Sequence, residues 1–497
     1  MMHRFKPVFL LAPLAALLIA AAPTDPGAAP AREDRLAQAA ALVDAGKAAD
    51  ALAILDALLV ESDLPAEKGQ VEGLRSFALA RTGKFAETRQ AIEFAVDATM
   101  NPSLLLLRQL FVLRAIGGDL PAAAQTLQLV AVSNPKWLPE LPAELVAEVL
   151  RGLDDEQQRF DLAYTLVTAG HAPADQTVGQ ADDLKLQVIT GLAQRGRLEE
   201  AGPIIEALRN PVSLVRLGID RRTQPLWPAM EARLGPGADT ADAAFIAAAE
   251  KRLAEQPQSL IARSGVAEAL NIASKEPEAL ARIRDIGATP EALAKLKERE
   301  LWIINQKAAL LTDAGEIDAA LAALDAVVAL PGDARSNTLA FRILAADMAV
   351  EAGRHDDALK RADAVPAADL NDYGRHALAA IRTCALARSG KAANAAKAAE
   401  ALPAGWVKGG NNRATQMALA CLGRMDAAAA ILIKRLEETD SRDDALFELQ
   451  PFLIADRANA PDRMTKASLR TLKARPDVKA AFTKWGRDLP AAVSPPR

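Results

Sequence analysis

The residues that could carry chemistry in this sequence are few, and their spacing does not suit it. Apart from His3 at the N-terminus, the only histidines are His171, His355 and His376. No two of them stand four positions apart, as two metal ligands on adjacent helix turns would, and no HExxH motif occurs. No Gly-x-Ser-x-Gly elbow, P-loop or dinucleotide-binding glycine pattern follows a predicted strand. We therefore expect no catalytic, metal-binding or cofactor-binding residues, and predict that the protein is not an enzyme.

Paired acidic residues are the next candidates for chemistry. They mostly stand where predicted helices begin, and a carboxylate there is favoured by the positive end of the helix dipole. Helix capping therefore explains them better than general acid–base catalysis. The pairs are Asp154 and Asp155, Asp182 and Asp183, Asp356 and Asp357, and Asp443 and Asp444.

Cys384 and Cys421 are the only cysteines. Each lies near the end of a predicted helix, and the two helices belong to neighbouring units of the repeat described below. In an oxidising compartment the pair would form a disulfide that joins two units. The alternative is two small, core-like thiols, because a four-residue offset along adjacent helices leaves the Cα separation undetermined against the limit of about 7 Å for a disulfide.

Composition favours thin layers of helices over one large core. Hydrophobic residues make up 51% of the 497 residues, but aromatic residues only 4%, so Ala, Leu and Val dominate. Ala has the highest helix propensity and lets helices pack closely. The net charge is −5 and there is no basic run, which argues against nucleic acid or a polybasic membrane contact.

The N-terminus has the pattern of an export signal. Arg4 and Lys6 precede an apolar stretch from Val8 to Ile19, and small residues follow. We expect a signal peptide over residues 1–21 and a flexible leader over 22–32, with an uncleaved membrane anchor as the alternative. No later segment reaches the ~20 apolar residues of a spanning helix. The expected location is periplasmic, or alternatively secreted.

A repeated turn is the strongest signal in the chain. An apolar helix ends at Gly, a small residue follows five positions later, and a second apolar helix begins. The Gly and small-residue pairs are Gly46 and Ala51, Gly83 and Thr88, Gly118 and Ala123, Gly196 and Ala201, Gly315 and Ala320, Gly353 and Ala358, Gly390 and Ala395, and Gly423 and Ala428. Self-similarity at roughly 34–45 residues is typical of a helical solenoid.

Each position of the pattern has a physical reason. Gly adopts the left-handed conformation that ends a helix without a Cβ penalty. The small residue lies where the two helices cross, and a Pro further on ends the second helix. Ser274, five positions before Ala279, takes the place of Gly in one unit.

The pattern extends over residues 33–440, as about ten or eleven helical hairpins that are degenerate around 140–180 and 220–257. Residues 441–490 are expected to form a C-terminal capping helix group, since a terminal repeat must cover an exposed apolar face. Residues 491–497 are expected to be a disordered tail.

These residues resemble the tetratricopeptide repeat (TPR) family, in which Gly and Ala hold the turn and packing positions. The large apolar residue four positions after the Ala is here Leu55, Ile92, Leu127, Ile205, Leu324 and Leu432. The sequence departs from the family where an aromatic would stand in the first helix. The resemblance implies an all-α, right-handed solenoid of stacked antiparallel helix hairpins whose first helices line a concave groove.

The same resemblance implies which residues face a partner. Transferred by register from the Gly, the groove positions are Arg81, Arg108, Asp183, Gln194, Trp302, Asn305, Asp313, Asp347, Arg388 and Arg413, and Phe77 and Met417 stand in the same register as apolar anchors. The family's carboxylate clamp is absent, because the positions six before the Gly carry no Asn. We do not expect recognition of an acidic C-terminus of the chaperone type.

The sequence therefore predicts a periplasmic scaffold that binds a protein or an extended peptide in its groove, in envelope assembly. One alternative is an accessory component of envelope polysaccharide export or secretion that acts with a separate outer-membrane partner. Another is a cell-wall enzyme built on a helical superstructure, which would need a compact catalytic domain that the residues after Asp440 are too few to form.

Overall fold

The computed structural model describes residues 31–495 except 100–101, 142, 174–175, 332–337 and 456–462. The described residues form helices and connecting turns, and the pair Asp220 and Gly486 makes an isolated β-bridge. The chain divides into two compact units, an N-terminal unit that ends at Asp175 and a C-terminal unit that begins at Gln176. The fold is an all-α, TPR-like right-handed solenoid of stacked antiparallel hairpins with a C-terminal capping group.

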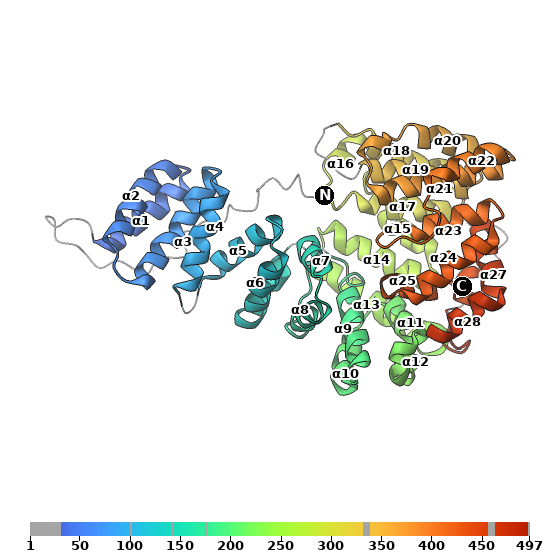
Figure 1. The fold of residues 1–497 in the computed structure, drawn as a ribbon, viewed down its shortest axis with the longest axis horizontal. Helices are drawn as coiled ribbons and strands as arrows, with labels where there is room; N and C mark the ends of the chain where they lie inside the picture. Colours follow the sequence, from blue (N-terminus) through green and yellow to red (C-terminus); the bar gives the residue numbers. More distant parts are fainter. Residues whose placement is uncertain are drawn as a thin grey trace. The chain divides into compact units, whose positions relative to one another are not determined.

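The N-terminal unit is a row of four helix hairpins (Figure 1). Consecutive helices pack against each other along the row, so each hairpin covers the apolar side of the next. Its elements are α1 (Arg32–Asp44), α2 (Ala48–Glu61), α3 (Pro65–Arg81), α4 (Phe85–Asp97), α5 (Leu104–Ile116), α6 (Leu120–Ser133), the 3-10 helix η3 (Pro135–Glu140), α7 (Ala143–Gly152) and α8 (Glu156–Thr168).

The C-terminal unit continues the repeat and interrupts it once. Its first elements are α9 (Asp182–Gln194), α10 (Leu198–Ala207), α11 (Pro211–Ile219), η4 (Arg221–Leu226), α12 (Trp227–Leu234), η5 (Pro236–Ala238), α13 (Asp239–Glu255), α14 (Leu260–Ile272), α15 (Glu276–Ile283) and α16 (Pro290–Ala294). The 3-10 helix η4 stands between α11 and α12 in place of a Gly turn, whereas Gly235, with a φ of +70°, follows α12.

Four regular hairpins follow: α17 (Trp302–Asp313), α18 (Ile317–Val328), α19 (Thr338–Glu351), α20 (His355–Asp363), η6 (Ala367–Asp369), α21 (Asp372–Arg388), α22 (Ala392–Ala398), η7 (Ala399–Ala401), α23 (Asn412–Cys421) and α24 (Met425–Glu437). The capping group is α25 (Thr439–Glu448), α26 (Pro451–Ile454), α27 (Arg463–Ala474) and α28 (Pro476–Trp485).

The turn residues adopt the conformation that the sequence predicts. Each of the eight repeat glycines has a φ between +70° and +78°. Ser274 has a φ of +56°, so it fills the Gly position of the unit formed by α14 and α15. At Gly46 the backbone closes a Schellman motif, in which Lys47 N–H donates to Leu42 O at 2.8 Å. The prediction that Gly, and once Ser, ends the first helix is confirmed.

The small residues lie in the helix crossings. All eight residues five positions after a repeat Gly are fully buried, and so is Ala279 of the Ser274 unit. The large apolar residues four positions later are buried as well, from Leu55 to Leu432. Because the residue at each crossing is small, the two helices of a hairpin can approach closely there.

The capping group returns to the beginning of its own unit. Helix α25 packs on α11 as well as on α24, and α28 packs on α24 and η4 (Figure 1). Arg487 N–H donates to Ile219 O at 3.0 Å, and Arg487 Nε donates to Gly218 O at 2.7 Å. The group thus closes the C-terminal unit, which the sequence did not predict. We call this contact between η4 with its flanks and the capping group the seam.

Several predictions concern residues that the structure does not describe. The signal peptide (1–21), most of the leader (22–32) and the last two residues of the tail (491–497) lie outside the described residues. The beginning of the tail is held in place, which differs from the expected disorder: Ala492 O accepts a hydrogen bond from Gly237 N–H at 2.9 Å. It follows the buried Leu489, which fixes the chain there.

Candidate functional site

Polar side chains from several helices meet on one surface of the C-terminal unit. We call this surface the inner wall and define it by Asp183 of α9, Glu268 of α14, Asp347 of α19, Arg413 of α23, and Asp444 and Glu448 of α25. Three of the predicted groove residues, Asp183, Asp347 and Arg413, belong to it.

One end of the inner wall lies around Asp183. Its side chain is exposed. Desolvation by the surrounding protein raises the pKa of its carboxyl, and the positive charge of Arg216 partly offsets this rise. Arg216 itself pairs with Asp444 at 2.8 Å and lies over the ring of Phe447. Helix α9 is thereby linked electrostatically to α11 and α25.

The other end lies around Asp347, which is also exposed. Desolvation raises the pKa of its carboxyl against the opposing charges of Arg413 and Arg388. Arg413 Nε pairs with Glu448 at 2.6 Å. Helix α19 is in this way linked to α23 and α25.

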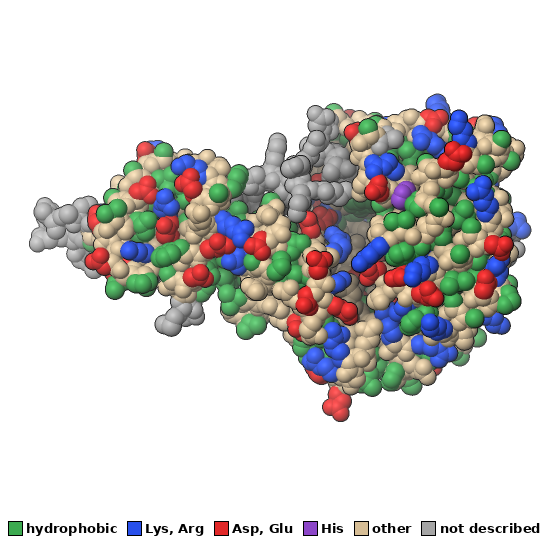
Figure 2. Space-filling model, in the orientation of Figure 1, with side chains coloured by type: hydrophobic (Ala, Val, Ile, Leu, Met, Phe, Trp, Pro, Cys, Tyr) green, Lys and Arg blue, Asp and Glu red, His purple; other side chains and the backbone are tan. Residues whose placement is uncertain are grey.

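Helix α25 joins the two ends. Asp444 and Glu448 stand four positions apart, so they lie one above the other on the same face of that helix. Asp444 reaches the Asp183 end and Glu448 the Asp347 end. The inner wall is therefore one surface, and Figure 2 shows the C-terminal unit hollowed, with acidic and basic side chains at the margin of the hollow.

Exposure and desolvation coexist at Asp183 and Asp347 because the surface is concave. Water reaches both side chains, but protein atoms replace much of the bulk water around them, which disfavours the charged carboxylate. A convex surface would leave an exposed carboxyl near its ordinary pKa.

Glu268 belongs to the inner wall but was not among the predicted groove residues. Its carboxylate accepts a hydrogen bond from Thr177 Oγ1 at 2.7 Å, and burial raises its pKa. It stands six positions before Ser274, the same register as Asp347 before Gly353. The sequence did contain a signal for Glu268. A groove register counted from Ser274, in the same way as from the glycines, would have included it.

The inner wall has an excess of negative charge. Arg216 pairs with Asp444, and Glu448 pairs with both Arg413 and Arg435, so these three arginines already have a carboxylate partner. Among the described residues, Asp183, Glu268 and Asp347 have no Lys or Arg within ion-pair distance. Three carboxylates are thus left to attract a positive charge, and desolvation by the surrounding protein raises the pKa of each.

The register placed Arg388 on the groove, but the structure does not leave it exposed there. Its side chain is only 6% exposed. It donates to Val350 O and to Thr465 Oγ1, both at 3.4 Å, and faces Glu351 at 3.6 Å. Thr465 is in α27, so the capping group covers this position, and Arg388 anchors α27 to α19 and α21.

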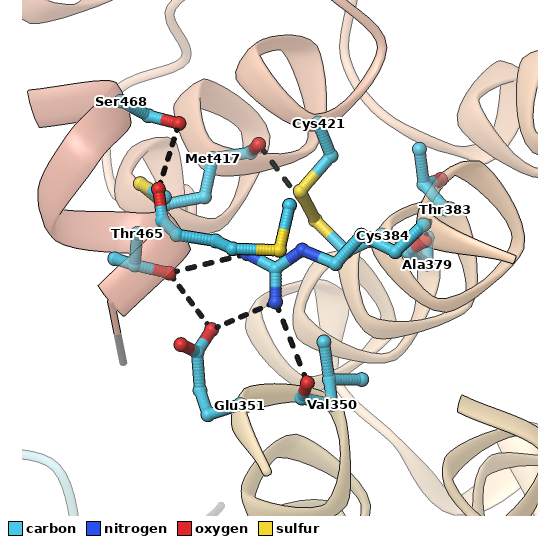
Figure 3. The surroundings of a disulfide bond; sticks show 11 residues. Val350, Glu351, Ala379, Thr383, Cys384, Met417, Cys421, Thr465 and Ser468 are labelled. Carbon is cyan, nitrogen blue, oxygen red and sulfur yellow. Dashed lines mark hydrogen bonds and ion pairs between the residues drawn. A yellow bond between two sulfur atoms is a disulfide. The ribbon is translucent and has the colours of Figure 1, made fainter. Parts of the chain in front are cut away.

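Cys384 and Cys421 are joined by a disulfide in the structure (Figure 3). The Cα separation that the sequence left undetermined is 5.2 Å, within the range that a disulfide spans. The bond links α21 to α23, the first helices of two adjacent hairpins. It therefore fixes the part of the unit that carries Arg413.

The remaining predicted groove residues differ in exposure. Trp302 is 39% exposed and stacks on the buried Phe341 with ring centroids 5.2 Å apart. Gln194 and Asp313 are exposed, and Asn305 is half-buried. Trp302 is the exposed aromatic residue of the set, and aromatic side chains of this kind often dominate the energy of a protein interface.

In the N-terminal unit the register places two arginines. Arg81 is exposed, and Arg108 is half-buried with its guanidinium 3.8 Å from Glu140. Phe77 is buried in the core and offers no apolar anchor, because it packs among the Leu, Ala and Val side chains of the first two hairpins. Met417, the second predicted anchor, is half-buried.

A cavity of about 650 Å³ lies at the seam, away from the inner wall. Its walls come from η4, α26, α27, α28 and the residues directly after α28. The side chains that line it include Arg221, Arg470, Lys473, Lys479, Arg487 and Asp488. We call it the basic cavity.

Within the described part of the chain, no group of His, Cys, Asp or Glu side chains has the arrangement of a metal site. None of the described helices combines the length and the apolar character needed to cross a bilayer.

Comparison with known proteins gives similarity of fold alone. No family model matches the chain, and no curated protein matches it. Solved structures that resemble it include the Cut9–Hcn1 hetero-tetramer of the APC/C, with 11% identity over 91% of this chain and 89% of the other, at a TM-score of 0.29. Another is Naa15/Naa10 bound to HypK-THB, with 14% identity over 90% of this chain and 76% of the other, at a TM-score of 0.24. Scores this low give no argument about function, and the TPR-like assignment rests on the turns and packing described above.

Proposed function

We propose that the protein is a non-enzymatic scaffold that holds a segment of another protein against the inner wall of its C-terminal unit. The observation that carries this proposal is a set of three carboxylates, Asp183, Glu268 and Asp347, that no Lys or Arg of the described residues pairs with and whose pKa values desolvation raises. A segment bearing Lys or Arg would neutralise these charges at a site where Coulomb attraction is weakly screened.

The shape of the surface supports a protein partner over a small molecule. Helices from several successive hairpins contribute to one continuous wall, and concave solenoid surfaces bind extended segments. Trp302 adds an exposed aromatic surface on α17, the helix that lies between α14 and α19 in chain order. A partner segment that runs along the wall would contact the carboxylates and the Trp302 ring one after another.

We further propose that the protein acts in the periplasm, in envelope assembly. The signal-like N-terminus motivates this, and the Cys384–Cys421 disulfide is consistent with an oxidising compartment. Fusing residues 1–32 to a reporter that is active only after export tests the location. A fusion protein that is made but stays inactive, and is found in the cytoplasmic fraction, would overturn it.

Binding can be tested with one charge-neutralising pair and one control pair. The test variant is Asp183→Asn with Asp347→Asn, since both side chains are exposed and their loss should leave the fold intact. The control is Glu278→Gln with Glu291→Gln, which removes the same charge from exposed positions on α15 and α16. Both proteins are compared as bait for envelope proteins and against labelled Lys/Arg-rich peptides.

We expect the test variant to bind about tenfold or more weakly than the control, the equivalent of one lost charge pair. Binding should also weaken as the pH falls, because the raised pKa values let these carboxyls take up protons above the usual range. Equal retention of partners by both variants would refute the assignment of the inner wall.

A further inference from the structure

We infer that the basic cavity is a binding site for a phosphate-bearing anion, and that this anion strengthens the closure of the C-terminal unit. The site is separate from the inner wall and does not depend on the proposed protein partner. The basic cavity is positively charged, it lies at the seam, and its occupation should stabilise the C-terminal unit.

The charge of the cavity is strongly one-sided. Among the described residues that line it, the carboxylate of Asp488 stands against five cationic side chains, namely Arg221, Arg470, Lys473, Lys479 and Arg487. Lys473 pairs with Asp488 at 2.5 Å, and Arg487 pairs with Glu231 at 2.5 Å.

Other cations around the cavity are held in place by backbone oxygens. Arg221 Nε donates to Thr483 O at 2.7 Å, and Arg470 Nη1 donates to Ile454 O at 2.6 Å. Arg221 also donates through Nη1 to Gln224 Oε1 at 3.4 Å, so its guanidinium is fixed by two contacts. Lys479 is exposed, and no side-chain contact is found for it among the described residues. The cavity thus combines cations whose positions are fixed with a lysine whose ammonium group can turn toward a ligand.

The residues come from both sides of the seam. Arg221 belongs to η4, near the beginning of the unit, whereas Lys479 belongs to α28, near its end. Like charges brought together by closure repel each other, and this repulsion opposes closure. An anion between them converts the repulsion into attraction. Its binding energy must therefore add to the stability of the seam.

Phosphate chemistry fits the site better than a single carboxylate. A phosphate monoester has a charge of about −1.5 to −2 at neutral pH and several acceptor oxygens. Guanidinium groups match those oxygens through paired hydrogen bonds. A cavity of about 650 Å³ holds more than one phosphate, so pyrophosphate and larger phosphate esters also fit.

Titration of the full chain with pyrophosphate, at ionic strength matched with NaCl, tests the site. We expect saturable binding by calorimetry. We also expect slower hydrogen exchange in η4 and α28, and no change in the N-terminal unit. Vesicles containing phosphatidylglycerol or only phosphatidylcholine form a second arm. Competition of the anionic vesicles with pyrophosphate would identify a lipid headgroup as the source, and binding of pyrophosphate alone a soluble phosphate.

The decisive variant is Lys479→Glu, which reverses one charge at an exposed position and should not impair folding. Lys295→Glu is its control, an exposed lysine beyond α16 with the same change of charge. We expect pyrophosphate affinity to fall about tenfold or more in Lys479→Glu and to stay within about twofold in the control, as one direct charge contact predicts.

Three results would overturn the inference. The first is absence of saturable pyrophosphate binding to the native chain. The second is equal affinity in the two lysine variants. The third is binding that leaves exchange at η4 and α28 unchanged, since an anion that bridges the seam must slow it.

Discussion

The two units are built from the same hairpin and differ in how they end. In the N-terminal unit the side-chain contacts join neighbouring helices: Arg32, for example, donates to Glu67 O, 35 positions away. In the C-terminal unit Arg487 donates to Gly218 O, 269 positions earlier. One unit is an array of nearest-neighbour contacts, and the other is closed on itself by its capping group.

This difference shows what a repeat does not encode. Stacking requires only that each hairpin match the next, so it follows from a periodic pattern. Closure requires that two segments at opposite ends of a unit match each other. The residues that do so are single, non-repeated positions: Gly486, which contacts Ile219 and Leu446 closely, and Arg487, which stacks on Trp227 at 3.6 Å.

The largest expected effect comes from truncating a core side chain at the seam, which should destabilise the C-terminal unit and leave the N-terminal unit unchanged. Leu446 of α25 is fully buried and lies against Gly486. Leu446→Ala should lower the stability of the C-terminal unit by about 2–5 kcal/mol through lost burial and a residual cavity. Hydrogen exchange followed by mass spectrometry would show faster exchange in α11, α25 and α28.

The N-terminal unit should be unaffected by that change. The matched control is Leu129→Ala in α6, because Leu129 is 43% exposed and its truncation should cost about 0.5 kcal/mol or less. If Leu446→Ala accelerated exchange equally in both units, the closed unit would not be an independent body, and the comparison would fail.

The disulfide provides a second, chemical way to act on one unit alone. Both cysteines lie in the C-terminal unit. Replacing them by Ala should destabilise that unit by about 2–4 kcal/mol, the usual range for a native disulfide. Thermal unfolding of the native chain with and without reductant should show the same shift, and the double variant should not respond to reductant. A shift of the double variant on reduction would contradict the assignment.

Gly486 tests how closely the seam is packed. A Cβ at this position would lie 2.5 Å from Leu446 Cδ2 and 2.9 Å from Ile219 O, so the seam must open to accommodate it. Gly486→Ala should cost about 1–3 kcal/mol, as overpacking does. Gly405→Ala is a fitting comparison, since a Cβ added at Gly405 would meet no other atom within 4 Å among the described residues. Urea unfolding of both variants measures the difference, and equal midpoints would argue against a tight seam.

The smallest expected effect is on pH dependence. Burial raises the pKa of Asp443 to about 6, with Arg222 opposing the rise and Asp220 adding to it. The protonated form is favoured in the folded state. This group therefore contributes most stability below its ordinary pKa of about 3.8 and loses that contribution as the pH rises through about 6.

Because the side chain of Asp443 is 36% exposed, solvent screening should limit the effect to about 1 kcal/mol. Asp443→Asn should flatten the pH dependence of the C-terminal unit between about pH 4 and pH 7, measured as urea midpoints at several pH values. The N-terminal unit should keep its profile. A variant whose profile matches that of the native chain would exclude Asp443 as the titrating group.

Three of the six residues that define the inner wall could be located from the sequence, but their surroundings and their ion pairs could not. The register counted from the glycines placed Asp183, Asp347 and Arg413 on one surface. It could not distinguish them from Arg388, which the same count includes and which α27 covers. It also omitted Glu268, because its unit ends in Ser274. The repeat register gives the face of the helix on which a side chain lies. What surrounds that side chain depends on other helices, which can be far away in the sequence.

The sequence by itself determined the local structure of this protein. Gly at a left-handed turn, a small residue at the helix crossing and apolar residues at helical spacing each act within one hairpin or between two neighbours, so they can be recognised in a single sequence. The tertiary structure alone decided the closure of the C-terminal unit, the pairing of the two cysteines and the charge left over on the inner wall. These depend on groups brought together over long stretches of chain, and such contacts leave no periodic trace.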